Sequence, residues 1–358
     1  MNVYNILVIN PGSTSTKIAV YQDEKPMFER SIEHSPKDLE SFEKIMDQLE
    51  YREKVILDVL KNEGYSLQDF NAIACRGGLI GPVESGTYVV DEAMVEALRN
   101  SKVEHASNLA GLIGYSLARK LGITAYITDP VSVDEMDDVA RISGMKEIER
   151  KSFSHALNIK AVARKAELEL GKKYTDMNLV IAHLGGGISI AALEHGRIVD
   201  VNGANDEGPF SPERSGELPV GDVVKVAYSG KYSKRELKKR YVGKGGLVAY
   251  LGTNDLRKAM KMAETDTDAM LVVRAMAYQI AKGIAEMWTV LNGNVDAIVL
   301  TGGMSLNSKF VEMIKSYVPN LALILVIAGA YEMEALALGA LRVLRGEEEA
   351  KTIEIVER

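Results

Sequence analysis

The hydrophobic pattern of the chain predicts short apolar strands that alternate with longer helices. Residues 6–9 and 18–21 form two apolar runs on either side of a turn of small hydroxyl residues. Helical spacing of apolar residues predicts helices over 42–60, 95–98, 109–121, 155–170, 269–291 and 335–344. Ser154 is a candidate N-cap of the helix over 155–170, and Gly171 marks its end. This alternation predicts an α/β protein.

The order of these elements occurs twice in the chain. Residues 7–29, LVINPGSTSTKIAVYQDEKPMFE, have a counterpart in residues 179–200, LVIAHLGGGISIAALEHGRIVD. Both segments have the pattern of a strand, a small-residue turn, a second strand, a polar turn and a third strand. NAIACRGG (71–78) and DAIVLTGG (296–303) form a second pair, each a buried strand that leads into a Gly-Gly turn. The repeated order predicts a duplicated α/β domain.

The length of the chain also favours two domains, because 358 residues exceed what one core usually organises. We expect a first domain of residues 1–150 plus 335–358 and a second of residues 151–334. The helix over 335–344 follows the second glycine turn and needs a core to cover it, which the first domain would supply. Two facing copies would form a cleft, where ligands commonly bind.

Composition excludes several classes of function. A net charge of −7 argues against a nucleic-acid-binding protein, and the basic segment 229–246 has the alternating charges of a solvated helix face. The single cysteine, Cys75, excludes an intramolecular disulfide and a cysteine metal cluster. No apolar run is long enough for a membrane span, and the chain enters a strand without a signal peptide. We therefore expect a cytoplasmic protein.

Three turns of small residues, at 10–17, 185–189 and 301–305, are candidates for binding phosphate. Glycine lets backbone N–H groups approach an anion closely, and Ser and Thr hydroxyls add further donors. Any one such turn is more commonly a tight turn without a ligand, but three of them, two within a repeat, favour phosphate binding. The motifs G-x-x-x-x-G-K-[ST] and G-x-G-x-x-G do not occur, which disfavours P-loop ATPases, Rossmann dehydrogenases and protein kinases.

Together these turns resemble those of the acetokinase family, within the acetate and sugar kinase, Hsc70 and actin superfamily. The motifs that carry the resemblance are VINPGSTSTK (8–17), IACRGG (73–78), EHASNLAG (104–111), ITDPVSVDE (127–135), SFSHALNIKAVAR (152–164), AHLGGGIS (182–189), NDEGPFSPERSGELP (205–219) and LTGGMSLN (300–307). HASN, SHALN and ERSGELP look like the members that act on butyrate or branched-chain acids. The resemblance implies duplicated ribonuclease H-like (actin-like ATPase) domains, with mixed sheets flanked by helices and an ATP cleft between them.

The implied activity is reversible phosphoryl transfer from ATP to the carboxylate of butanoate, by direct in-line transfer, giving butanoyl phosphate and ADP. A carboxylate is already ionised at neutral pH, so the chemistry requires Mg²⁺, arginines and positioned donors rather than a general base. The alternatives are a kinase for isobutyrate or another short branched-chain acid, an acetate kinase and a non-enzymatic nucleotide switch. Mg²⁺ with ATP or ADP is the implied cofactor, and a homo-oligomer is the implied assembly.

The resemblance assigns catalytic roles to Arg214, Arg76, His155, Asp129 and Asn10. Arg214 would lie beside the transferring phosphoryl group, although an exposed loop arginine is the alternative. Arg76 ends a buried strand, where a charge must be paired or face a cleft. Asn10 and Asp129 could instead form turns, and His155 could cap a helix.

Further residues are implied to bind the nucleotide and the metal ion. The binding residues are Ser13, Thr14, Lys17, His105, His183, Gly185, Gly186, Gly187, Asp255, Gly302, Gly303 and Asn307, of which the last four are expected near the adenosine. Asp129 and Glu334 are the expected contacts of Mg²⁺. Glu332 stays open as the alternative to Glu334, because either carboxylate could simply favour the N-terminus of the following helix.

Overall fold

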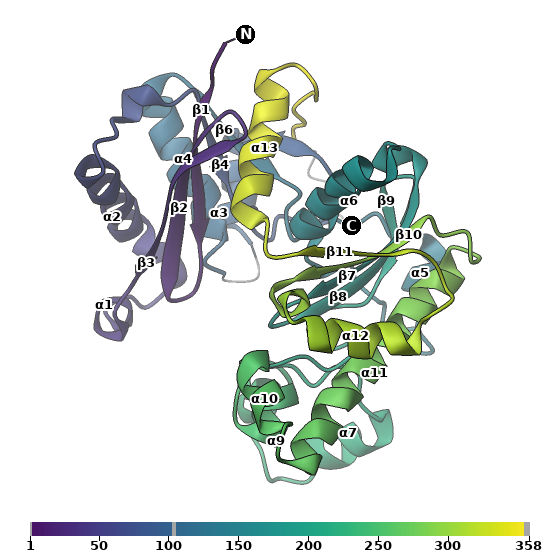
Figure 1. Ribbon diagram of the computed structural model, residues 1–358. Helices are drawn as coiled ribbons and strands as arrows, with labels where there is room; N and C mark the ends of the chain where they lie inside the picture. Colours follow the sequence, from purple (N-terminus) through teal and green to yellow (C-terminus); the bar gives the residue numbers. More distant parts are fainter. Residues whose placement is uncertain (1, 102–104, 354–358) are drawn as a thin grey trace. The chain divides into compact units, whose positions relative to one another are not determined.

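Two mixed β-sheets organise the chain in the computed structural model, which describes residues 2–101 and 105–353 (Figure 1). The first compact unit is Met1–Val133 with Tyr331–Arg358, and the second is Asp134–Ala330. The domain boundaries that the sequence suggests, at residues 150 and 334, remain predictions. Residues 354–358 of the predicted first domain, and Glu104 of the EHASNLAG motif, lie outside the described residues.

The sheet of the first unit has the strand order β3-β2-β1-β4-β6-β5. Its strands are β1 (Asn5–Pro11), β2 (Ser15–Gln22), β3 (Lys25–Glu33), β4 (Ala72–Cys75), β5 (Thr87–Val89) and β6 (Thr124–Thr128). Strands β1, β4 and β6 are parallel, whereas β2, β3 and β5 run antiparallel to their neighbours. The carboxyl ends of the three parallel strands therefore meet at one edge, where open α/β sheets usually bind ligands.

The sheet of the second unit has the order β11-β10-β7-β8-β9. Its strands are β7 (Asn178–Leu184), β8 (Ile188–Glu194), β9 (Arg197–Val201), β10 (Ala297–Gly302) and β11 (Ile324–Ala328). Strands β7, β10 and β11 are parallel, and β7-β8-β9 form an antiparallel meander. Because β9-β8-β7-β10-β11 repeats the order β3-β2-β1-β4-β6, the predicted duplication is confirmed.

Helices cover the sheets of both units. The first unit contains α1 (Pro36–Glu40), α2 (Leu49–Asn62), α3 (Glu92–Arg99), α4 (Asn108–Leu121) and α13 (Glu332–Leu344). The second contains α5 (Asp138–Arg141), α6 (Ala156–Leu170), α7 (Val220–Ala227), α8 (Lys234–Tyr241), α9 (Gly246–Leu251), α10 (Leu256–Met262), α11 (Thr267–Val290) and α12 (Ser308–Tyr317). Short 3₁₀ helices occupy Ile45–Gln48, Leu67–Asp69, Tyr174–Asp176 and Gly303–Leu306. Among these described helices, none is long and apolar enough to cross a membrane.

Several helix starts differ from the sequence prediction, and α3 and α13 each begin three residues before the predicted start. The segment predicted as a helix from residue 42 is a 3₁₀ helix over Ile45–Gln48, and α2 begins only at Leu49. His155, not Ser154, occupies the N-cap position of α6, with no side-chain capping bond. The Ser154 hydroxyl is instead buried without a hydrogen-bond partner among the described residues. Gly171 ends α6 in the left-handed conformation, as predicted.

The last long helix, α13, packs on the sheet of the first unit. It contacts β1, β4 and β6. Gly339 permits this approach, because a Cβ atom at that position would lie 2.0 Å from Thr128 Oγ1. The close packing brings the start of α13 to the same sheet edge as the ends of the parallel strands.

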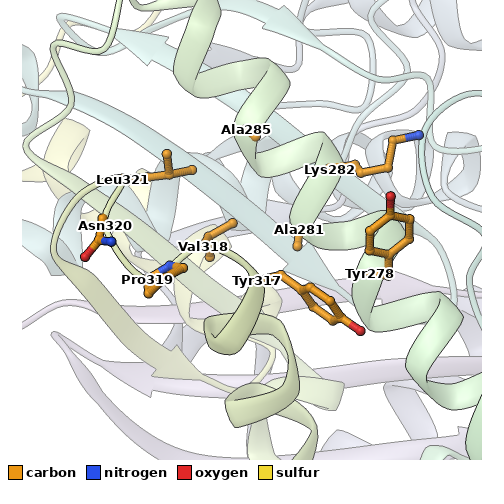
Figure 2. A pocket seen from close by; sticks show the side chains of 9 residues that line it. All are labelled: Tyr278, Ala281, Lys282, Ala285, Tyr317, Val318, Pro319, Asn320 and Leu321. Atoms are coloured by element: carbon orange, nitrogen blue, oxygen red, sulfur yellow. The ribbon is translucent and has the colours of Figure 1, made fainter.

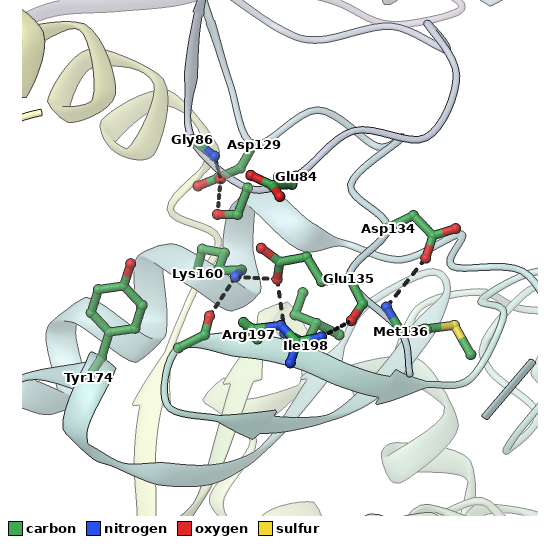
Figure 3. Close-up of polar contacts among 12 residues, drawn as sticks. Glu84, Gly86, Asp129, Asp134, Glu135, Met136, Lys160, Tyr174, Arg197 and Ile198 are labelled. Atoms are coloured by element: carbon green, nitrogen blue, oxygen red, sulfur yellow. Dashed lines mark hydrogen bonds and ion pairs between the residues drawn. The ribbon is translucent and has the colours of Figure 1, made fainter. Parts of the chain in front are cut away.

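A buried ion pair attaches the segment after Asp134 to the second unit (Figure 3). The Lys160 ammonium lies 2.6 Å from the Glu135 carboxylate and donates to the carbonyl oxygen of Gly196 at 2.5 Å. Glu135 also accepts the N–H of Ile198 at 2.9 Å. Because Lys160 is only 2% exposed, water screens this pair weakly.

We expect Lys160→Met to lower the free energy of unfolding by about 3–5 kcal/mol, because it leaves the Glu135 carboxylate buried without its cation. Urea unfolding would measure the change. Lys172→Met is the matched control, since Lys172 pairs with Asp296 at 2.7 Å but is 56% exposed. That pair should contribute at most about 1 kcal/mol. Equal losses in the two variants would contradict the expectation.

Candidate active site

In the first unit, three polar side chains meet at the edge where the parallel strands end. Asn10, near the end of β1, donates through Nδ2 to Glu332 Oε2 at 3.2 Å. Arg76 follows β4, and its Nη1 lies 3.2 Å from Glu332 Oε1. The backbone N–H of Arg76 donates to the carbonyl of Ile9, which fixes the two strand ends together. The structure thus brings together two predicted site residues with Glu332 rather than Glu334.

Glu334 lies two residues after Glu332, in the same first turn of α13. Its negative charge, after burial and Glu29, contributes to raising the pKa of Tyr21 to about 12. Tyr21 lies on β2, whereas Asn10 lies near the end of β1 and Arg76 follows β4. Glu332 and Glu334 are two residues apart, so on a helix their side chains point in different directions.

Asp129 follows β6 at the same edge and adopts a left-handed backbone conformation, with φ of 39°. This conformation is uncommon for a residue before proline, and such strain costs about 1–3 kcal/mol. The carboxylate accepts the Ser85 hydroxyl at 2.6 Å and the N–H of Gly86 at 2.9 Å. These bonds tie Asp129 to the segment over residues 85–86 and not to its own turn, so both the turn alternative and the metal role of Asp129 stay predictions.

His105 is a further predicted residue of the first unit. Its Nδ1 lies 2.6 Å from Ser107 Oγ. Burial lowers the pKa of His105, and the positive charge of Arg76 lowers it further. These two causes favour a neutral imidazole near the Arg76 guanidinium.

Ser13 and Thr14 are exposed in the hydroxyl-rich turn between β1 and β2, and Lys17 is exposed on β2. The N–H of Gly12 closes the turn by donating to the carbonyl of Ser15 at 2.7 Å. Beneath the turn lies Arg52 of α2, a side chain that sequence reasoning missed. Arg52 is fully buried and donates to several oxygens of this turn.

A sequence signal for Arg52 existed. Arg52, Ile56 and Leu60 recur at intervals of four and are the buried residues of α2. A charge at such a position lies on the apolar face of the helix and needs hydrogen-bonding partners there.

In the second unit, His155 and His183 lie side by side. Their rings stack with centroids 4.1 Å apart and an interplanar angle of 18°. His155 Nδ1 lies 2.9 Å from the hydroxyl of Ser189 on β8, and His183 Nδ1 lies 2.9 Å from Asn158 Nδ2 on α6. Since each ring contacts a polar group through Nδ1, its orientation is fixed. The structure brings these two predicted residues together at the end of β7.

Arg214 lies against the glycine turn that joins β7 and β8. A Cβ atom at Gly187 would come within 2.2 Å of Arg214 Nη1, so only glycine allows this approach. Arg214 Nη1 donates to the carbonyl of Ala204 at 2.7 Å, and burial lowers the pKa of the guanidinium. The Ser211 hydroxyl links the Arg214 backbone to the glycine turn. It accepts the backbone N–H of Arg214 and donates to the carbonyl of Gly186. Arg214 is therefore a packed, positioned arginine and not a free surface side chain.

The residues expected near the adenosine form helix starts and a tight turn. Asp255 caps α10 and pairs with Arg257 at 2.8 Å, which lowers the Asp255 pKa to about 2. Asn307 caps α12 by accepting the N–H of Phe310 at 3.0 Å. Gly302 has φ of 88°, and a Cβ atom there would lie 2.4 Å from the carbonyl oxygen of Leu184. Gly302 thus lets the end of β10 pack closely against the end of β7, while the adenosine role of these four residues stays a prediction.

The carboxylates of the first unit suit a metal ion that is held mainly by phosphate. Among the described residues, no group of three or more His, Cys, Asp or Glu side chains could hold a metal ion. Mg²⁺ commonly binds one or two carboxylates together with substrate phosphates and water. Glu332, the first residue of α13, and Asp129, which follows β6, are the carboxylates of this edge that such a site could use, and their metal role stays a prediction.

A pocket of about 290 Å³ lies elsewhere in the second unit, between α11 and the segment that follows α12 (Figure 2). Tyr278 and Tyr317 line it with ring centroids 5.4 Å apart, together with Lys282 and Leu321. None of the predicted site residues lines this pocket. It therefore does not coincide with the predicted nucleotide site.

Comparison with known proteins identifies the class of enzyme. The chain is 58% identical over 350 residues to a probable butyrate kinase of Thermotoga petrophila, covering 98% of both chains. It is also 58% identical over 349 residues to probable butyrate kinase 1 of Thermotoga maritima, covering 97% of this chain and 98% of the relative. These relatives and the fold define an ATP-dependent carboxylate kinase. Residues 144–328 match the model of the Acetokinase family, and the chain belongs to that family.

Solved structures show the same fold. The acetate kinase of Porphyromonas gingivalis superposes with a TM-score of 0.79 at 20% identity, covering 95% of this chain and all of that one. A propionate kinase of Francisella tularensis has a TM-score of 0.75 at 20% identity, and the match covers 94% of this chain and 98% of that one. The predicted fold class, family and enzyme class are therefore confirmed. Nucleotide and a short-chain carboxylate are the substrates of the family.

Proposed function

We propose that the protein catalyses reversible phosphoryl transfer between ATP and butanoate, giving butanoyl phosphate and ADP. The observation that carries the proposal is the 58% identity, over nearly the whole chain, to relatives named as probable butyrate kinases. HASN and SHALN, which resemble the butyrate and branched-chain members, support the same choice. Isobutyrate is the second candidate on the same motifs.

Arg214 and His155 are the proposed contacts of the transferring phosphoryl group. Arg214 lies against Gly187, in the turn that follows β7. The stacked rings of His155 and His183 lie at the end of the same strand. Two positioned cationic or donor groups beside a glycine turn suit the equatorial oxygens of a phosphoryl group in transfer. The turn residues Gly185 and Gly186 would supply backbone N–H donors to the nucleotide phosphates.

In the first unit, Asn10 and Arg76 are the proposed partners of the reacting anions. Both contact Glu332, so this carboxylate orients them. Ser13, Thr14 and Lys17 would bind phosphate from the neighbouring turn. No side chain is required to remove a proton, because the attacking carboxylate carries none at neutral pH.

Mg²⁺ is the proposed metal ion, held by Glu332 and Asp129 together with nucleotide phosphate. When bound, it would neutralise charge on the phosphate oxygens. The contact between Glu332 and both Asn10 and Arg76 supports Glu332 in place of the earlier expectation, Glu334. Asp255, His105, Gly302, Gly303 and Asn307 are proposed to bind the nucleotide.

Two broader assignments accompany this function. We propose a cytoplasmic location, since ATP is the phosphoryl donor, and a homo-oligomer, as the family resemblance implies. Size-exclusion chromatography with light scattering would determine the number of subunits.

The test is acyl-phosphate formation from Mg-ATP and a panel of acids, trapped as hydroxamate with hydroxylamine. We expect the highest kcat/KM with butyrate or isobutyrate. Propionate and valerate should also react, because one methylene in an apolar pocket changes binding by only about 1–3 kcal/mol. Activity with acetate alone would contradict the choice of substrate. The absence of product with every acid, in a protein that binds ATP, would contradict the function itself.

A further inference from the structure

The turn between β1 and β2 is held from below by one buried side chain. Arg52 Nη1 donates to the carbonyl of Gly12 at 2.9 Å and to that of Ser15 at 3.0 Å. Arg52 Nη2 donates to the carbonyl of Ser13 at 3.2 Å. The remaining bonds go to Gln48 and Thr16, at 3.0 Å each. A single guanidinium therefore satisfies three backbone carbonyls of the hydroxyl-rich turn.

The direction of these bonds determines where the turn points its donors. In a trans peptide the C=O and the following N–H point in opposite directions. The Gly12 carbonyl belongs to the same peptide as the Ser13 N–H, and the Ser13 carbonyl to the same peptide as the Thr14 N–H. When Arg52 binds both carbonyls, both N–H groups point away from it. Neither N–H has a hydrogen-bond partner in the described chain, and both residues are exposed.

Arg52 also lacks a compensating negative charge. It is fully buried, and no carboxylate forms an ion pair with it among residues 2–101 and 105–353. The side-chain groups that Arg52 contacts, the Thr16 hydroxyl and the Gln48 amide, are neutral. Burial and the charge of Arg52 lower the pKa of His34, which bonds to Thr16, whereas the carboxylates of Glu33 and Asp38 raise it. A buried cation without a counter-ion acts through a low-dielectric medium, so its attraction extends to an anion on the far side of the turn.

We propose that Arg52 is a positioning residue for phosphoryl transfer. It holds the peptides of Ser13 and Thr14 with their N–H groups directed at a substrate phosphate, and its positive charge adds to the attraction. Hydrogen bonds to both carbonyls polarise these peptides and strengthen the opposite N–H groups as donors. The inference rests on the proposed function, in which this turn binds phosphate.

Arg52→Lys and Arg52→Met test the proposal. Lysine keeps the charge but lacks the planar fork that reaches two carbonyls together, and methionine removes both. We expect the KM for ATP to rise about tenfold or more in both variants, since bonds to a charged group contribute more than ordinary ones. The Kd of adenosine, which carries no phosphate, should not change.

A merely structural role would lower stability without this selectivity. Arg342→Met is the matched control, since it removes a partly buried arginine of the first unit that pairs with Glu348 at 2.7 Å. It should lower the Tm and leave the KM for ATP unchanged. Folded Arg52 variants whose KM for ATP stays within about twofold of the wild-type value overturn the proposal.

A milder variant covers the case in which neither Arg52 variant folds. Gln48→Met removes only the acceptor of Arg52 Nε and should raise the KM for ATP in the same direction. A folded Gln48→Met enzyme with the wild-type KM then overturns the proposal. Failure of the proposed function is a separate result, because it would appear as absence of acyl phosphate with the wild-type protein.

Discussion

Arg214→Ala should lower kcat for acyl-phosphate formation by about 10³-fold or more, the scale of an arginine that stabilises charge in phosphoryl transfer. The structure places this guanidinium against Gly187 and holds it through Ala204, so its position does not depend on the substrate. The variant removes positive charge where the γ-phosphoryl group would pass to the acid. Hydroxamate formation with butyrate at saturating ATP measures the loss.

The controls separate the loss of charge from the loss of structure. Arg235→Ala, on the exposed helix α8, removes an arginine from the same unit and should leave kcat unchanged. Arg214→Lys keeps a charge but not the planar geometry, and should recover only part of the rate. An Arg214→Ala enzyme that folds and keeps a tenth of the wild-type kcat would contradict the assignment.

Glu332→Gln should have the second large effect, on the dependence of activity on Mg²⁺. Glu332, at the start of α13, accepts from Asn10 and pairs with Arg76, so it lies beside the ends of β1 and β4. The amide keeps the size of the side chain but removes the negative charge that a metal ion requires. We expect kcat/KM for Mg-ATP to fall about 100-fold, which corresponds to about 2.7 kcal/mol. A Mg²⁺ titration at fixed ATP measures both the rate and the metal requirement.

Glu334→Gln is the control for this experiment because it lies on the same first turn of α13. It should stay close to wild type in Mg²⁺ requirement. If Glu334→Gln loses activity and Glu332→Gln keeps it, the original sequence-based choice of Glu334 was right. If both variants keep activity, neither glutamate contacts the metal ion.

The sequence predicted the fold because its information is local and repeated. The spacing of apolar residues identified α4, α11 and α13, and comparison of the two halves identified the meanders around the turns at 10–17 and 185–189. Strands are recognisable from a few residues, and the same order of strands in both halves leaves few topologies. The start of α2 was less predictable, since apolar spacing does not distinguish a 3₁₀ turn from the first turn of an α-helix.

The choice between Glu332 and Glu334 lay beyond the sequence. Both carboxylates precede the same apolar stretch, and a helix brings only one of them to Asn10. That selection depends on the rotation of α13, which is set by its packing on β6 through Gly339. The rotation of α13 about its axis depends on how its side chains pack against β6, more than 200 residues earlier in the chain. No local sequence pattern encodes this packing.

Arg52 is a second case in which the tertiary structure decided what the sequence could not. By itself, the sequence determined that the turn over residues 10–17 is rich in potential donors and that a duplicated α/β fold holds it. Only the tertiary structure decided that an arginine from α2 binds the carbonyls of Gly12 and Ser13 and leaves the N–H groups beyond them directed outward. The physical reason is that hydrogen-bond direction depends on where a distant side chain is buried, whereas strand and helix periodicity depend on near neighbours.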